Sequence, residues 1–316
     1  APSYNSQNIN TILDWSSWTG ASGGFQGAIE MCNNNGSCRK LDGGVMCPSF
    51  RVTKDEKDST RGRANSLRLA LSGQLGKDAL ISENMNETMK LCVSCKACKR
   101  ECPTGVDMSK MKIEISYLRA KKFGLDINSK LVAFLPYYAP IASKFALIMN
   151  LRDKLPGLAK LSEVFLGFTS KRPLPKWRSD YFKNKELPNN LNKINNSTPV
   201  ILFVDTFNRY YEPENIRSAI NVLKKAGYYP FIPTLPNSSK ILCCGRTYLS
   251  NGLIDNAKNE MLNILNAFRP YLKQGISIVG LEPSCILSFR DEIPNLIKSE
   301  DTEYLKNNSH TFEELL

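Results

Sequence analysis

The feature that most constrains the fold of this chain is a run of four cysteines, Cys92, Cys95, Cys98 and Cys102, followed at once by Pro103. The spacing C-x2-C-x2-C-x3-C-P is that of bacterial ferredoxins, in which three thiolates hold one iron–sulfur cluster and the fourth reaches a neighbouring cluster. Four cysteines this close together are too crowded to pair as disulfides. Zinc is the alternative, but zinc sites generally use two separated pairs of ligands. We therefore expect a segment that folds around iron–sulfur clusters.

A second cysteine group lies upstream and contains Cys32, Cys38 and Cys47, the last again followed by a proline. Set against the ferredoxin spacing, Cys32 takes the first place and Cys38 the third. Cys47 takes the fourth place after a short insertion, and Asn35 stands where the second cysteine would be. The alternative is that Cys32 and Cys38 are ordinary buried thiols.

Exchange of the fourth ligands between the two groups predicts two ligand sets. The first set comprises Cys92, Cys95, Cys98 and Cys47, and the second comprises Cys32, Cys38 and Cys102. The second set is one cysteine short, so it predicts either a 3Fe–4S cluster or a 4Fe–4S cluster with water or a side chain on the open iron. Arg51, Arg61 and Arg63 lie between the groups, where cations raise the reduction potential of a cluster. The alternative for these arginines is a solvated helix face.

The composition narrows the class of protein. Ten cysteines without a recognisable secretion signal favour metal or redox chemistry over disulfides. A lone histidine, His310, argues against mechanisms that need a histidine base. The net charge of +12 suits a nucleic acid, an anionic membrane surface or acidic partners. Aromatic residues are not interleaved with the basic residues near the cysteines, so we expect no nucleic-acid partner, and a zinc-stabilised nucleic-acid-binding module is kept as an alternative.

The first half of the chain reads as mainly helical. We expect an irregular junction over 1–30, a helical dicluster domain over 31–124 and a helical, then extended linker over 125–196. Ala64, Leu67 and Leu71 recur at helical spacing. The same spacing relates Met108, Met111, Ile115 and Leu118, with Asp107 placed to cap that helix.

The segment 197–316 reads as a parallel α/β domain. Strands are expected at VILFVD, YYPFI, KILCC and ISIVGL, with helices between them and to the end of the chain. Alternating strands and helices are typical of a parallel sheet. The fold class is therefore mixed, with a helical ferredoxin-type domain, a helical linker and an α/β domain.

The cysteine region is similar to a known family. CNNNGSCRK and GVMCPSFRVTKDEKDSTRGRANSLR, followed by CVSCKACKRECPTGVDM, resemble the iron–sulfur region of bacterial FAD-linked dehydrogenases of 2-hydroxy acids, namely D-lactate and D-2-hydroxyglutarate. Related iron–sulfur subunits serve glycolate oxidase and anaerobic glycerol-3-phosphate dehydrogenase. The resemblance covers nearly the whole chain, and the family's fused enzymes also lack the cysteine at Asn35.

The C-terminal part resembles the cysteine-rich CCG domain of the same enzymes and of heterodisulfide reductase. The motif stands as Cys243, Cys244 and Gly245, whereas Thr206 and Glu282 replace family cysteines and Cys285 keeps one. The carboxyl ends of strands are where ligands gather in such sheets. A metal or cluster held by Cys243, Cys244, Cys285 and Glu282 is thus one reading. A metal-free thiol site or buried structural cysteines are the others.

The resemblance implies an oxidoreductase part that carries electrons from a flavin to a quinone or another carrier. It implies no catalytic residue here, because FAD and the substrate site belong to a flavin-binding domain or subunit that acts as partner. A heterodisulfide-reductase-like thiol protein is the alternative. The chain starts without Met and ends before a second CCG unit, so we expect a piece of a longer enzyme or one subunit of a split one. We expect a cytoplasmic protein, with peripheral contact to the inner face of the cell membrane through 131–178 as a secondary reading.

Overall fold

The computed structural model describes residues 9–18, 22–191, 196–236, 238 and 240–316. Parts of the expected junction (1–8 and 19–21) and the end of the expected linker (192–195) lie outside the described residues. The chain divides into two compact units, 1–124 and 125–316. The expected linker belongs to the second unit. Among the described residues, no helix has the length and apolar character needed to cross a bilayer.

The first unit is helical, as expected. Its helices are α1 (Gly24–Glu30), α2 (Pro48–Thr53), α3 (Thr60–Leu71), α4 (Glu83–Lys90), α5 (Ala97–Glu101) and α6 (Met108–Phe123), with 3-10 turns η1 (Ser37–Arg39), η2 (Glu56–Asp58) and η3 (Ala79–Ile81). The side chains of Ser59 and Asp107 cap α3 and α6 by accepting hydrogen bonds from backbone N–H groups of the first turn. The apolar faces predicted for these two helices are buried, apart from Leu118, which is partly exposed.

The start of the first unit is held by a buried carboxylate. Glu114 of α6 accepts hydrogen bonds from the backbone N–H of Ile12 at 2.7 Å and of Leu13 at 3.2 Å. It also accepts one from the indole N–H of Trp15 at 3.1 Å. The expectation of an irregular stretch over 1–30 was wrong at α1, which forms because Phe25, Ala28 and Ile29 are buried although its sequence carries no cap.

The second unit contains the sheet. Its helices before the sheet are α7 (Ile127–Ala133), α8 (Leu135–Lys144), α9 (Ala146–Met149) and α10 (Leu158–Leu166), with η4 (Asn150–Asp153) and η5 (Asn184–Glu186). The strands are β1 (Thr198–Phe203), β2 (Tyr228–Phe231), β3 (Ser277–Gly280) and β4 (Ser309–Thr311). The remaining helices are α11 (Thr206–Tyr210), α12 (Pro213–Lys225), α13 (Arg246–Ser250), α14 (Ile254–Leu272), α15 (Pro283–Ile286), η6 (Leu287–Phe289), α16 (Glu292–Leu296), α17 (Glu300–Asn308) and α18 (Phe312–Leu315).

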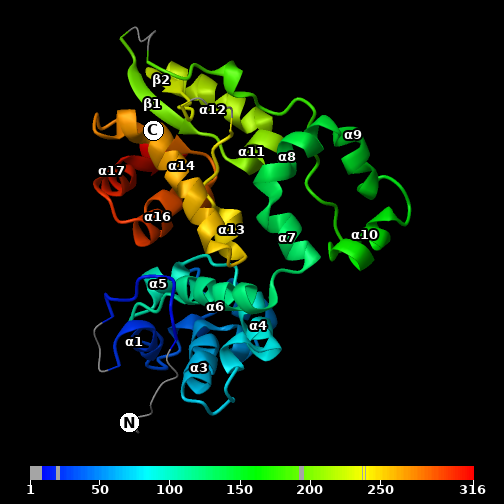
Figure 1. The fold of residues 1–316 in the computed structure, drawn as a ribbon, viewed down its shortest axis with the longest axis vertical. Helices are drawn as coiled ribbons and strands as arrows, with labels where there is room; N and C mark the ends of the chain where they lie inside the picture. Colours follow the sequence, from blue (N-terminus) through cyan, green and yellow to red (C-terminus); the bar gives the residue numbers. More distant parts are fainter. Residues whose placement is uncertain (1–8, 19–21, 192–195, 237, 239) are drawn as a thin grey trace. The chain divides into compact units, whose positions relative to one another are not determined.

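The predicted parallel sheet is confirmed. Its order is β2-β1-β3-β4, and all three pairs of neighbouring strands are parallel (Figure 1). Val200 and Leu202 of β1 face a core that includes α12. On the other face, the Phe203 ring packs edge-on against Phe289, which in turn meets Phe268 of α14. The central strand is therefore covered on both faces, as its continuous apolar sequence indicates.

Two sequence expectations in this unit were wrong. KILCC forms no strand, because Cys243 and Cys244 lie in a loop that ends at Gly245. Gly245 has a left-handed backbone (φ 78°), and a Cβ there would stand 2.9 Å from the Ala257 carbonyl oxygen of α14, so the loop packs on a helix and pairs with no strand. The short strand β4 was missed within a stretch expected to be helical.

Candidate metal centre

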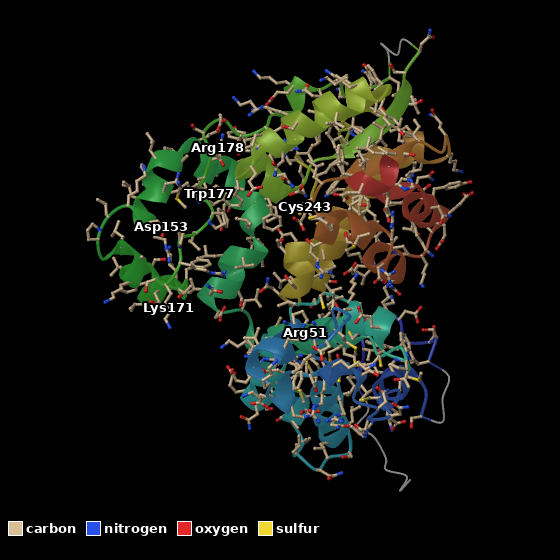
Figure 2. All side chains as sticks on the ribbon, turned by 180° about the vertical axis from the view of Figure 1, so that it is seen from behind. Arg51, Asp153, Lys171, Trp177, Arg178 and Cys243 are labelled. Carbon is tan, nitrogen blue, oxygen red and sulfur yellow. The ribbon has the colours of Figure 1, made fainter. Side chains whose placement is uncertain are left out.

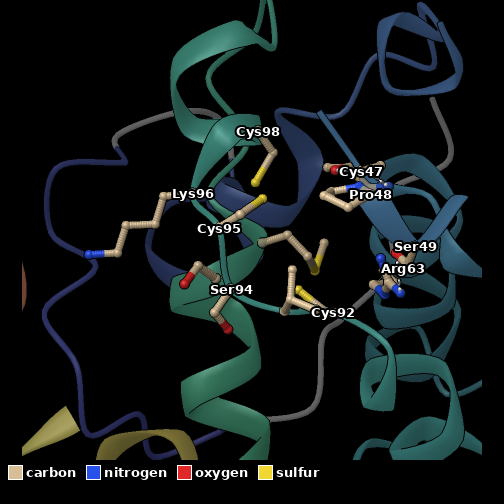
Figure 3. A pocket seen from close by; sticks show the side chains of 13 residues that line it. Cys47, Pro48, Ser49, Arg63, Cys92, Ser94, Cys95, Lys96 and Cys98 are labelled. Atoms are coloured by element: carbon tan, nitrogen blue, oxygen red, sulfur yellow. Dashed lines mark hydrogen bonds between the residues drawn. The ribbon is translucent and has the colours of Figure 1, made fainter. Parts of the chain in front are cut away.

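A cavity in the first unit is lined by four cysteines that the sequence analysis assigned to one ligand set: Cys47, Cys92, Cys95 and Cys98. It encloses about 320 Å³ of empty space, part of which is open to solvent. Figure 3 shows the sulfur atoms of Cys92, Cys95 and Cys98 directed into the cavity, whereas the Lys96 side chain points away. The structure thus gathers this set around one space, and the role of its members as ligands stays a prediction.

The backbone around this cavity is strained. Cys47 (φ 51°), Ser94 (φ 54°) and Lys96 (φ 59°) adopt the left-handed conformation, which costs a non-glycine residue about 1–2 kcal/mol. Three of the chain's left-handed non-glycine residues therefore lie in the two loops that carry the cysteines. Such strain persists where surrounding contacts fix the backbone, and it is characteristic of ligand-holding loops.

Two helix N-termini supply hydrogen bonds to the cysteines of this cavity. The Thr60 N–H of α3 donates to Cys47 Sγ at 3.0 Å, and the Thr60 hydroxyl lies 2.9 Å from the same sulfur. Backbone N–H groups of Met108 and Ser109, at the start of α6, act on Cys98 and lower its pKa, although burial dominates and raises that pKa to about 11. The positive ends of both helices are thus directed at sulfur atoms that carry negative charge when they bind iron.

The second predicted set, Cys32, Cys38 and Cys102, also lies close enough for mutual interaction. The charges of Cys38 and Cys102 both act on Cys32, whose pKa is raised chiefly by burial. The Arg61 N–H of α3 donates to Cys38 Sγ at 3.4 Å. Assignment of these three residues to a second cluster stays a prediction.

The two sets meet at the start of α3. A hydrogen bond between the Cys38 and Cys47 side chains, the largest influence on both, lowers the pKa of Cys38 to about 6 and raises that of Cys47. These two cysteines were assigned to different clusters from the sequence. Consecutive N–H groups, those of Thr60 and Arg61, therefore serve sulfur atoms of the two sets.

The residue in place of the missing cysteine bonds within its own loop. Asn35 Nδ2 donates to Asn33 Oδ1 at 2.6 Å, and its Oδ1 accepts from the Ser37 N–H at 2.9 Å. The Asn35 side chain is exposed. In this conformation both ends of the amide are occupied, so the structure assigns no fourth ligand to the second set.

The sequence analysis singled out three arginines, and the structure gives each a different role. Arg63 is 1% exposed, lines the cavity and donates to the Asp58 carbonyl oxygen at 2.6 Å, so a solvated face is wrong for this residue. Arg61 bonds to Glu56 at 2.7 Å. Arg51 Nη2 donates to the carbonyl oxygens of Gly43 and Gly44.

Residues that the sequence analysis missed hold the loop before Cys47. Glu101, next to Cys102, accepts hydrogen bonds from the Val45 N–H at 3.0 Å and the Met46 N–H at 3.1 Å. The two cysteine groups are thereby tied together. Neither Glu101 nor Thr60 carries a pattern in the sequence that marks it, because each acts through a contact between distant segments.

A separate group of thiols lies in the second unit, where Figure 2 marks Cys243. Cys243, Cys244 and Cys285 are buried, and Cys244 hydrogen-bonds to both of the others. The bond to Cys244, with burial, raises the pKa of Cys243 well above its ordinary value. The charge of Glu282 acts on Cys285. Thr206 begins α11 after β1, and Glu282 caps α15 after β3, so the residues after these two neighbouring strands lie near the thiols, as expected.

Across the described part of the chain, no group of three or more His, Cys, Asp or Glu side chains is positioned to hold a metal ion. The donor set around the first cavity nonetheless fits an iron–sulfur cluster. Thiolates are the ligands such clusters take, and backbone N–H groups that point at the sulfur atoms stabilise their negative charge. For the thiols of the second unit, metal binding stays a prediction.

Comparison with known proteins agrees with the cysteine pattern. Residues 28–106 match the family described as 4Fe-4S dicluster domain. The chain is 24% identical over 325 residues to D-2-hydroxyglutarate dehydrogenase of Escherichia coli K12, covering 89% of this chain and 31% of the relative. The corresponding enzyme of Pantoea ananatis is 25% identical over 320 residues, with 86% and 30% covered.

A further relative is one separate polypeptide of a larger enzyme. It belongs to the anaerobic glycerol-3-phosphate dehydrogenase of Escherichia coli K12 and is 24% identical over 162 residues, covering 51% of this chain and 40% of the relative. No solved structure matches. The chain is thus an iron–sulfur dicluster protein, distantly homologous over most of its length to D-2-hydroxyglutarate dehydrogenases, and it spans about 30% of their length. The dicluster domain implies two iron–sulfur clusters.

Proposed function

We propose that this chain is the iron–sulfur electron-transfer part of an FAD-dependent dehydrogenase of 2-hydroxy acids. The observation that carries the proposal is the cavity lined by Cys47, Cys92, Cys95 and Cys98 inside a dicluster segment. The flavin-binding partner accepts electrons from the substrate, and a quinone or another carrier receives them from this chain. D-2-hydroxyglutarate is the first substrate to try with that partner, because it is named in the relatives that cover most of the chain.

The chain's own residues would bind and tune the redox centres. A bound iron–sulfur cluster supplies a centre that takes up and releases single electrons. Thiolates of the first set would hold one cluster, and those of Cys32, Cys38 and Cys102 the other. The N–H groups of Thr60 and Arg61 point at sulfur atoms, which favours the more negative, reduced form and raises the potential. Arg63 adds a buried positive charge at the cavity wall.

The proposal is tested by anaerobic expression followed by iron and sulfide analysis and EPR spectroscopy. We expect about eight iron and eight sulfide per chain if both clusters are of the 4Fe–4S type, and about seven iron if the second is 3Fe–4S. Cys95→Ser should remove one signal and leave the other, with Cys243→Ser as a control that leaves both. Zinc without labile sulfide would overturn the proposal.

A second candidate function rests on the buried thiols of the second unit. Mutual hydrogen bonding of Cys243, Cys244 and Cys285 places three sulfur atoms together beside Glu282. We propose this group as a site for a metal, for a further cluster, or for thiol chemistry of the heterodisulfide-reductase type. If it does thiol chemistry, Cys243→Ser abolishes disulfide reduction while both dicluster signals persist. If it binds metal, the same variant loses iron or zinc relative to wild type.

A further inference from the structure

The segment around α9 and α10 exposes an unusual number of large apolar side chains. Leu147 is 80% exposed, Val164 79% and Phe165 65%, and α10 buries none of its residues. Ile148 and Leu161 are also more than half exposed. We call the residues from Phe145 to Leu166 the projecting segment. Soluble proteins rarely leave so many large apolar side chains together in water unless something covers them.

The projecting segment is a built element of the second unit. Arg152 of η4 donates to the Ser162 hydroxyl at 3.0 Å and to the Thr169 carbonyl oxygen at 2.6 Å, which fixes the start of α10 and the chain that follows it. Asn128 of α7 donates to the Leu166 carbonyl oxygen at 3.1 Å. Figure 1 shows α9 and α10 at the side of this unit away from the sheet. The exposed side chains are therefore presented by a fixed framework.

The charges around the projecting segment are mainly positive. From Lys144 to Lys176 the sequence contains seven Lys or Arg and only two acidic residues. The two acids are engaged, since Asp153 pairs with Arg152 and Glu163 accepts from the Ser170 hydroxyl at 2.6 Å. Within the residues that the structure describes, Lys154 and Lys160 have no carboxylate within salt-bridge distance. Figure 2 marks Asp153 and Lys171 at the outer end of this region.

We propose that the projecting segment binds the surface of an anionic lipid bilayer and holds the protein there peripherally. Apolar side chains between unpaired lysines match such a surface, because acyl chains accept the former and lipid phosphates the latter. A protein partner fits less well. Protein interfaces favour Arg and are depleted in Lys, whereas the cations here are mostly Lys. The short helices also spread their apolar residues around the axis, which suits a fluid layer better than a rigid face. This inference does not depend on the proposed electron transfer.

Vesicle co-sedimentation of the full chain tests the proposal. Phosphatidylcholine vesicles that contain phosphatidylglycerol should pellet the wild-type protein at low salt, and pure phosphatidylcholine vesicles should pellet much less. Val164→Ser with Phe165→Ser should weaken binding at least ~10-fold, because both side chains leave the bilayer interface. Lys154→Gln with Lys160→Gln should weaken it about fivefold per charge, corresponding to about 1 kcal/mol for each lysine.

A matched control exists in the first unit. Val52 and Phe123 are 83% and 63% exposed, nearly the same as Val164 and Phe165, and Val52→Ser with Phe123→Ser should leave vesicle binding unchanged. Circular dichroism and iron content establish that each variant is folded. The proposal is overturned if wild type pellets with neither kind of vesicle, or if the control weakens binding as much as the Val164 and Phe165 pair. It is equally overturned if that pair leaves vesicle binding intact and disrupts self-association or binding to a flavin dehydrogenase.

Discussion

Replacing Thr60 by proline removes one hydrogen bond to a predicted cluster ligand and leaves the helix in place. Thr60 is the first residue of α3, where proline is well accepted because the N–H there has no partner within the helix. The preceding residue, Ser59, is already extended (φ −86°, ψ 160°), as a residue before proline should be. The substitution deletes both the N–H that bonds to Cys47 Sγ at 3.0 Å and the nearby hydroxyl.

The expected effect is a lower reduction potential of the cluster bound by the Cys47 set. A hydrogen bond to a charged acceptor contributes about 1.5–3 kcal/mol, and the share that differs between oxidised and reduced sulfur is taken as about 1 kcal/mol. Since 59 mV corresponds to a tenfold change for one electron, this share lowers the potential by about 40 mV. Thr60→Val removes the hydroxyl and keeps the N–H, so the difference between the two variants isolates the backbone bond.

An EPR-monitored redox titration of both variants and wild type measures this difference. The signal of the second set serves as an internal reference, because Arg61 keeps its N–H to Cys38 in both variants. Potentials of Thr60→Pro and Thr60→Val that agree within ~10 mV would refute a role for the N–H of Thr60. Equal shifts of both signals would also refute it, because they indicate a general displacement of α3.

Three further predictions concern the first unit. Gly62→Ala should destabilise it by about 1–3 kcal/mol in chemical denaturation, because the new Cβ would stand 2.0 Å from the Glu56 carbonyl oxygen, whereas at Gly27 the closest atom is 3.7 Å away and Gly27→Ala should be neutral or better. Glu114→Gln leaves one of three donors unpaired, so we expect a loss of about 1–3 kcal/mol and a red shift of Trp15 fluorescence; burial raises the pKa of Glu114, so its contribution to stability falls as pH rises from 4.5 through that raised pKa, and the variant should lose this dependence. Arg63→Met should cost about 3–5 kcal/mol, because Asp58, 1% exposed, loses its ion-pair partner; an unchanged denaturation midpoint would contradict this.

The elements with strong local signals were predictable. The cysteine spacing pointed to the residues that line one cavity, and the apolar run of β1 and the periodicity of α3 and α6 were read correctly. These signals are local because the residues that carry them are neighbours along the chain or along one helix face. The parallel sheet followed from the alternation of strands and helices.

Elements that depend on distant contacts were not predictable from the sequence. α1 has glycines at two positions and no capping side chain, and it forms because Phe25 packs edge-on against Trp15. β4 has only three residues, Ser309 to Thr311, and forms where β3 offers an open edge. Thr60 and Glu101 reach their partners across the fold, so their contributions to the candidate site became visible only in three dimensions.

The start of α3 also bears on how the protein acquires its iron. Thr60 and Arg61 are consecutive, and their N–H groups bond to Cys47 and Cys38, which the sequence assigns to different clusters. Iron binding at Cys47 would fix the first helical turn and thereby place the amide that Cys38 needs. The ordering entropy of that turn is then lost once for two sites. Loading of the two clusters is therefore expected to be cooperative, with few chains that carry one cluster during stepwise addition of iron and sulfide.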